Sequence, residues 1–131
     1  MAACSINTAV KNLVVMGANL KKIAILDNFC WCSSDDEGRL YELRKAAEAC
    51  YDYAVTYKTP FISGKDSMYN DFKGFNQNNK PTKISIPPTL LISSIGIVDN
   101  INHLTKITPE KDDVIYVLGE THNELDKSQY E

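Results

Sequence analysis

The stretch from Leu40 to Pro60 constrains the fold most, because its apolar residues recur with the period of an α-helix. Charged residues occupy the opposite side, where Arg44 and Glu48 form an i,i+4 pair. Asp35 or Asp36 is placed to cap the start of the helix, and Pro60 ends it. We therefore predict a helix that packs by one face, through Leu40, Leu43, Ala47, Cys50, Ala54 and Tyr57.

The remaining apolar runs predict one more helix and several short strands. Residues 5–16 show helical spacing, and Gly17 stands where a C-cap is expected. Strands are expected at 22–28, 61–63, 84–86, 90–98 and 114–118. This order predicts an α/β fold of the α+β type, a mixed sheet with helices on one face.

Polar segments are expected to form the connections. The tetrapeptide Gly64-Lys65-Asp66-Ser67 resembles a polar turn after a strand, and residues 70–83 a flexible loop. Pro87-Pro88 argues against one unbroken central strand across residues 84–98. A strand that opens at 114–118 shortly before the chain stops is typical of a truncated sequence.

Composition excludes several classes of protein. The chain has 131 residues, a formal net charge of -3 and no basic stripe, which argues against a nucleic-acid binder. No apolar run approaches the roughly 20 residues of a membrane span, and the N-terminus lacks the pattern of a signal peptide. We therefore expect a cytoplasmic protein without a membrane or nucleic-acid partner.

The four cysteines give little sign of a metal site. No C-x-x-C pair is present, and nothing indicates the secreted context in which disulfides are usual. Cys30-Trp31-Cys32 could chelate a metal together with His103 or His122, but buried free thiols are the commoner outcome. We expect Trp31 in the core and both histidines at the surface.

Three stretches together resemble the second half of phosphoribosylformylglycinamidine synthase. The most specific is Pro60-Phe61-Ile62-Ser63-Gly64-Lys65-Asp66-Ser67, within residues 49–71. The other two are residues 9–31, with Asp27-Asn28-Phe29-Cys30-Trp31, and residues 84–93, with Ile86-Pro87-Pro88-Thr89. Their order and spacing fit that family along nearly the whole chain.

The resemblance implies an enzyme built from two copies of the aminoimidazole-ribonucleotide-synthetase fold. Residues 1–104 would be most of an N-terminal domain of the second copy, and residues 105–131 a linker and the start of the next domain. The family's ligase converts formylglycinamide ribonucleotide to the amidine, using ATP, Mg²⁺ and ammonia that a glutaminase domain or subunit releases from glutamine. The fragment alone is expected to be inactive.

The resemblance also implies a nucleotide and substrate site. Gly64 would lie at the nucleotide, and Ser67 would contact the substrate. Lys65 stands where shorter relatives carry a magnesium-binding Asn, so it would neutralise phosphate instead. Asp27 and Asn28 would contact the nucleotide, although both also fit a structural role in the following loop.

Two residues are metal candidates. Asp66 could hold a cation beside bound phosphate. Asn12 matches an Asn of a family Glu/Asn pair, but the Glu position is Thr8, which predicts weak or absent metal binding at that helix.

Alternative interpretations remain open. The first is a non-catalytic module of the same fold that holds a nucleotide or forms an interface, which Thr8 and Lys65 favour. Another is a related synthetase of aminoimidazole ribonucleotide or selenophosphate, whose motifs fit less well. In either case, a lone copy would expose the apolar sheet face that its twin normally covers, so we expect a homo-oligomer through the sheet.

Overall fold

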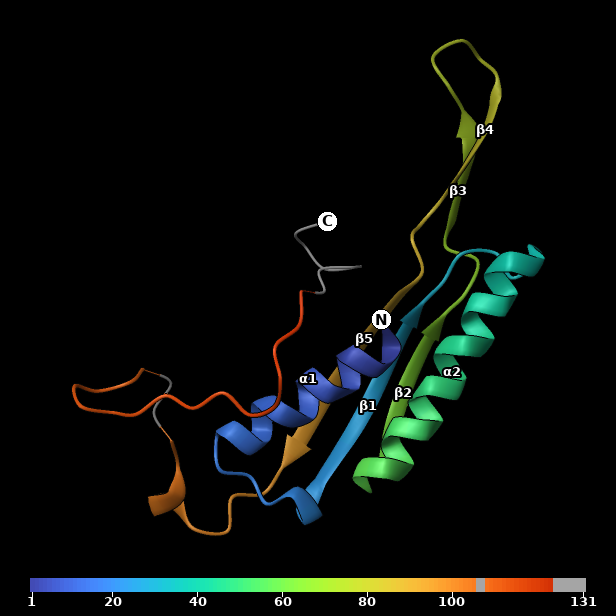
Figure 1. Ribbon diagram of the computed structural model, residues 1–131. Helices are drawn as coiled ribbons and strands as arrows, with labels where there is room; N and C mark the ends of the chain where they lie inside the picture. The colour runs from blue at the N-terminus through green and yellow to red at the C-terminus, as the bar shows by residue number, and fades with distance from the viewer. Residues whose placement is uncertain (106–107, 124–131) are drawn as a thin grey trace.

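The computed structural model describes residues 1–105 and 108–123. All of its helices and strands lie between Ala2 and His103. The predicted α+β class is confirmed, because two helices cover one face of a small mixed sheet (Figure 1). The division into domains at residue 104 stays a prediction.

Helix α1, Ala2–Val15, starts three residues earlier than predicted and ends in the predicted glycine cap. Gly17 adopts a φ of +93°, and its N–H donates to Val14 O at 2.9 Å. The N–H of Ala18 donates to Leu13 O at 3.0 Å. This pair of bonds closes the last turn, and glycine adopts such a φ without steric cost. A 3₁₀ turn, η1 (Leu20–Lys22), then leads into the sheet.

Helix α2, Glu37–Tyr57, confirms the longest helix prediction. The Asp36 side chain accepts from the N–H of Arg39 at 3.0 Å, and Lys58 closes the helix in the left-handed conformation. The buried stripe is rotated from the predicted one, because the small Ala46 faces the core while Leu40 and Ala47 are exposed. The residues on the inner side are Leu43, Ala46, Ala49, Cys50, Ala54 and Tyr57.

The three-stranded sheet has the order β2-β1-β5. Its central strand is β1, Ile23–Cys30, which pairs in parallel with β2, Phe61–Ser67, and antiparallel with β5, Thr89–Gly96. Residues 64–67, predicted as a turn, are therefore strand. Their backbone bonds to β1 outweigh their turn preferences, and the exposed edge position tolerates their polar side chains.

A second sheet is the hairpin β3, Asp71–Phe75, with β4, Pro81–Ser85. The prediction of a flexible loop at 70–83 was wrong, because this segment pairs with itself around a turn. The Asn76 side chain accepts from the N–H groups of Asn78 and Lys80 in that turn. The hairpin projects away from the body of the protein (Figure 1).

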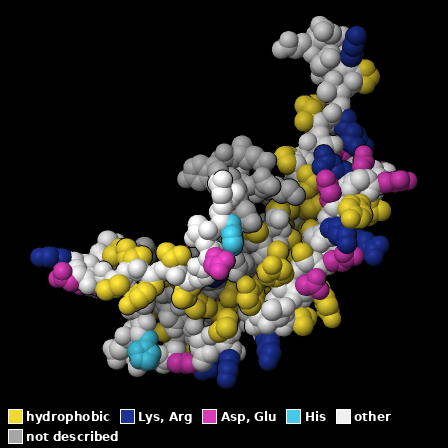
Figure 2. All heavy atoms as spheres, viewed as in Figure 1, with side chains coloured by type: hydrophobic (Ala, Val, Ile, Leu, Met, Phe, Trp, Pro, Cys, Tyr) yellow, Lys and Arg dark blue, Asp and Glu magenta, His cyan; other side chains and the backbone are white. Residues whose placement is uncertain are grey.

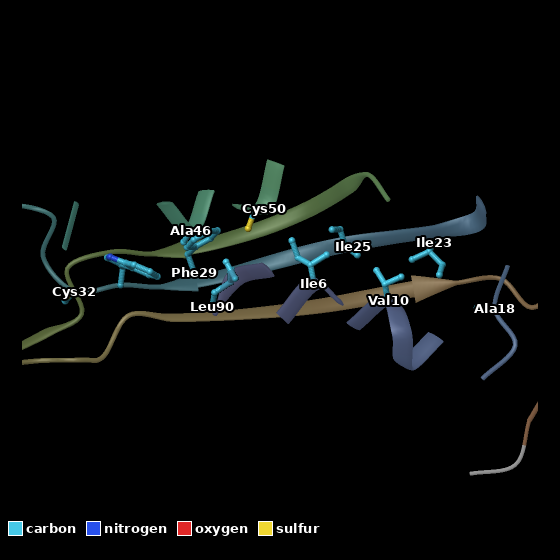
Figure 3. Packing of buried hydrophobic residues seen from close by; sticks show 12 residues of the cluster. Ile6, Val10, Ala18, Ile23, Ile25, Phe29, Cys32, Ala46, Cys50 and Leu90 are labelled. Atoms are coloured by element: carbon cyan, nitrogen blue, oxygen red, sulfur yellow. The ribbon is translucent and has the colours of Figure 1, made fainter. Parts of the chain in front are cut away.

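The core lies between the sheet and the two helices. Alternate β1 residues Ile23, Ile25 and Phe29 point toward it, and Ile6 and Val10 of α1 meet them (Figure 3). Trp31 is buried, as predicted, and its indole N–H donates to Arg39 O at 3.0 Å.

The segment after β5 contains one short turn, η2 (Ile101–His103). The strand predicted at 114–118 does not form in the structure, and all five side chains are at least 70% exposed. A strand needs a partner for its backbone groups, and the described part of the chain offers none there. The polar tail predicted after Glu120 continues past residue 123, outside the described residues.

Candidate phosphate-binding face of the sheet

The alternation of side chains along β1 and β2 divides the predicted site between the two faces of the sheet. Asp27 lies beside Gly64 in the register, and Asn28 lies beside Lys65. Because neighbouring residues of a strand point to opposite faces, Asp27 and Gly64 lie on the helix-covered face. Asn28 and Lys65 lie on the open face, opposite the helices.

The open face gathers polar groups near the carboxyl ends of β1 and β2. Ser67 lies beside Cys30 in the register, on the same face as Asn28 and Lys65. The Lys65 ammonium donates to Ser67 Oγ at 2.8 Å, and the Cys30 thiol donates to Asn28 Oδ1 at 3.6 Å. We call Asn28, Cys30, Lys65 and Ser67 the open-face cluster.

The open-face cluster has the chemistry of an anion site. A lysine ammonium supplies a mobile point charge with three donors, and serine and asparagine add neutral donors. Lys65 is exposed, whereas Asn28, Cys30 and Ser67 are half-buried, so three of the four groups are held by the sheet. Such a set can neutralise and orient one phosphate group.

Sequence reasoning missed one member of this cluster, Cys30, and one neighbour of it, Thr89. Cys30 extends β1 beyond its predicted end, and Thr89 of β5 lies opposite it in the register. Thr89 donates to Pro87 O at 2.9 Å, which leaves its oxygen able to accept. Residues two apart in a strand share a face, so the spacing of Asn28 and Cys30 could have placed them together. The predicted strand ended at Asn28, so this spacing was not used.

On the helix-covered face, Asp27 and Gly64 are in direct contact. A Cβ atom on Gly64 would lie 2.2 Å from Asp27 Oδ1, so glycine makes room for this carboxylate. Behind it, burial raises the pKa of the Cys50 thiol to about 11, and the nearby Asp27 carboxylate adds to the shift.

The two metal candidates are separated in the fold. Asn12 is exposed on α1 and, with Thr8, borders a groove beside β5. Asp66 lies on β2, the opposite edge strand of the sheet, beside Phe29 in the register. Within residues 1–105 and 108–123, no group of three or more His, Cys, Asp or Glu side chains could hold a metal ion. The metal assignments stay predictions.

Comparison with known proteins identifies the relatives of this fold. No family model matches the chain. It is 28% identical, over 123 residues, to phosphoribosylformylglycinamidine synthase subunit PurL from Staphylococcus aureus strains JH9 and Newman. That alignment covers 94% of this chain. The chain is PurL-like.

A solved structure supports the fold of the PurL-like chain. PurLQS from Thermotoga maritima superposes with a TM-score of 0.61 at 23% sequence identity, over 82% of this chain and 16% of that one. The PurL-like chain spans about 15% of the length of its curated relatives. The resemblance inferred from the sequence motifs is therefore confirmed for this stretch.

The structure also shows the positions of the histidines and cysteines that the sequence analysis considered. His103 and His122 are both exposed, and the four cysteines, which all lie in the described part of the chain, are free thiols. None of the described helices is both long and apolar enough to cross a membrane.

Proposed function

We propose that this chain forms part of a PurL-type ligase and supplies a phosphate-contacting surface on the open face of its sheet. The observation that carries the proposal is the convergence of Asn28, Lys65 and Ser67 on one face, within a PurL-like stretch. The reaction of such a ligase joins ammonia from glutamine to formylglycinamide ribonucleotide. ATP phosphorylates the amide oxygen, and ammonia then displaces phosphate.

Each residue of the open-face cluster has a role in this proposal. Lys65 neutralises a phosphate of the nucleotide or of the phosphorylated amide, and Ser67 orients the substrate by hydrogen bonding. Lys65 and Ser67 already contact each other, so one anion can engage both. Asn28 adds an amide donor from the neighbouring strand.

The proposed nucleotide contacts on the other face are of a different kind. Asp27 is a carboxylate, which repels phosphate and accepts hydrogen bonds from ribose hydroxyls or base amino groups. Gly64 stays a proposed nucleotide contact through its backbone, because its side-chain space holds the Asp27 carboxylate. Mg²⁺ at Asn12 or Asp66 would depend on phosphate oxygens and water for most of its ligands, because hard cations take six oxygen ligands.

The complete activity requires groups that this stretch of sequence does not supply. We propose that the chain acts in the cytoplasm with the rest of a PurL-type synthetase and with a glutaminase domain or subunit. It would also associate with a second copy through the sheet. The 131-residue chain by itself would then bind phosphate compounds without turning over substrate.

A non-catalytic role is the second candidate. The resemblance implies that Lys65 and Thr8 stand where relatives carry metal ligands, in which case each replacement removes a ligand for Mg²⁺. This pattern favours a module that holds a nucleotide without using it. Binding that is independent of Mg²⁺ would favour this candidate, and binding that requires Mg²⁺ would favour the ligase.

Calorimetric titration with ADP and ATP, with and without Mg²⁺, tests the proposal. We expect Lys65→Gln to weaken binding roughly tenfold, since charge-assisted hydrogen bonds contribute about 1.5–3 kcal/mol. Lys73→Gln, on the hairpin, is the matched control and should leave affinity unchanged. Equal losses in both variants would show a general charge effect and would contradict the assignment of Lys65.

A further inference from the structure

A second site lies on the opposite side of the sheet, between α2 and the β1–β2 pair. Here a hollow of about 340 Å³ opens beside Asp27, and its walls are mostly apolar. The volume is at the small end of the range for ligand pockets. Its lining includes Asp27, Cys50, Tyr51, Ala54, Val55 and Phe61.

The Asp27 carboxylate has no hydrogen-bond or ion-pair partner within the described part of the chain. It is half-buried, and its Oδ1 leans over the backbone of Gly64. No lysine or arginine lines the hollow. Carboxylates that are partly withdrawn from water usually find a donor or a cation, because desolvation disfavours an unpaired charge.

The walls of the hollow add to the preference for a positive charge. The Cys50 thiol stays protonated at neutral pH, because burial and the Asp27 charge raise its pKa to about 11. Asp27 is therefore the sole charge that the lining contributes. At the rim, the rings of Tyr51 and Phe61 are 69% and 37% exposed, and aromatic faces attract cations.

We propose that this hollow binds a small organic cation, an ammonium or amidinium group carried on an apolar body. The charged group pairs with Asp27, and the apolar body covers Ala54, Val55 and the aromatic rim. A phosphate compound is disfavoured because Asp27 would repel it. A Mg²⁺ or Ca²⁺ ion is disfavoured because a single carboxylate provides too few oxygen ligands.

This site is independent of the proposed phosphate site. Asp27 and the open-face cluster lie on opposite faces of the sheet, so the two inferences fail separately. Asp27 is also a proposed ribose or base contact, but a chain that binds no phosphate at the open-face cluster can still bind the cation at Asp27, and the reverse also holds.

Three probes separate the contributions of charge and apolar contact. Calorimetric or NMR titration of the 131-residue chain would compare phenethylammonium with its neutral analogue 2-phenylethanol and with methylammonium, which lacks the apolar body. We expect phenethylammonium to bind at least tenfold more tightly than either. Equal binding of the neutral alcohol, or no saturable binding of any probe, would overturn the proposal.

Two variants locate the site. Asp27→Asn keeps the shape of the side chain and should lower the affinity for phenethylammonium roughly tenfold, whereas Asp52→Asn, on the exposed side of α2, should not change it. Tyr51→Ala removes a rim contact without disturbing the core, and should weaken phenethylammonium severalfold and methylammonium less, because only phenethylammonium has an apolar body to cover the rim. Unchanged affinity in both Asp27→Asn and Tyr51→Ala would show that the probe binds elsewhere.

Discussion

At the scale of single residues, two glycines are required by contacts rather than by flexibility. Gly64 gives space to the Asp27 carboxylate on the neighbouring strand. Gly17 combines a positive φ with close packing, because a Cβ there would lie 2.6 Å from the backbone oxygen of His103. A side-chain carboxylate can rotate away, but a backbone carbonyl cannot move without displacing its chain, so Gly17 is the less replaceable of the two.

We therefore expect Gly17→Ala to lower the free energy of unfolding by about 1–3 kcal/mol, through strain at positive φ and overpacking. Urea denaturation would measure the loss. Gly38→Ala in the first turn of α2 is the control and should leave stability unchanged or raise it by up to about 1 kcal/mol. Equal stability of the Gly17→Ala and wild-type chains would contradict the account of this cap.

At the scale of elements, the β3–β4 hairpin is stabilised by contacts at its base. The side chain of Asp71 is 1% exposed, and Lys83 Nζ lies 3.2 Å from its Oδ2. Along the arm, Phe72 and Ile84 lie opposite each other and are 58% and 60% exposed. Figure 2 shows hydrophobic side chains at the surface of the projecting arm. Two-stranded hairpins without a covering layer are marginally stable, so the Asp71–Lys83 pair has a large share in ordering the arm.

The Asp71 pair makes the hairpin sensitive to acid. The Ser85 hydroxyl and the Lys83 ammonium hold the pKa of Asp71 below its ordinary value. Its contribution is therefore complete above the ordinary carboxyl pKa and is lost as the pH falls through the lowered value. We expect Lys83→Ala to raise that pKa, as measured by NMR titration of the Asp71 carboxyl carbon.

Lys83→Ala should also accelerate amide hydrogen exchange across residues 71–85, while exchange in β1 stays unchanged. Lys80→Ala, near the tip, provides the comparison. Equally accelerated amide exchange in both variants would assign the effect to the net charge of the hairpin and not to the Asp71–Lys83 pair.

An element can be predicted from the sequence when interactions between nearby residues stabilise it. Helix α2 was predictable because its apolar period and its Asp36 cap are local. The strand character of residues 64–67 was not, because turn-forming residues become strand only through pairing with β1. Likewise, Asn28, Lys65 and Ser67 were named from the sequence, but their common face followed only from the register between two strands.

At the scale of the whole molecule, residues 1–105 and 108–123 cover the sheet on one side only. On the open face, Leu91 and Ile95 of β5 are 59% and 62% exposed, beside the half-buried Leu26 of β1. This apolar area adjoins the open-face cluster, which lies nearer the carboxyl end of β1. Apolar faces of this kind usually bind another surface, which supports the proposed association through the sheet.

If two copies associate through the open face, Ile95→Lys should convert the chain to a monomer in sedimentation velocity experiments at high concentration, because a buried lysine would be unpaired. Val15→Lys, an equally exposed position at the end of α1, should leave the association unchanged. A wild-type chain that stays monomeric at every concentration would exclude this interface.

Phosphate binding on the open face can be tested by a methyl NMR titration of the chain with ADP. Each methyl group lies on one face of the sheet, so a shift of its resonance reports binding at that face. We expect saturable shifts for Leu26 and Leu91, which lie beside Asn28 and Lys65, and unchanged resonances for Ile6 and Ile25 in the core. Shifts confined to the helix-covered side, or no shifts at saturating ADP, would contradict it.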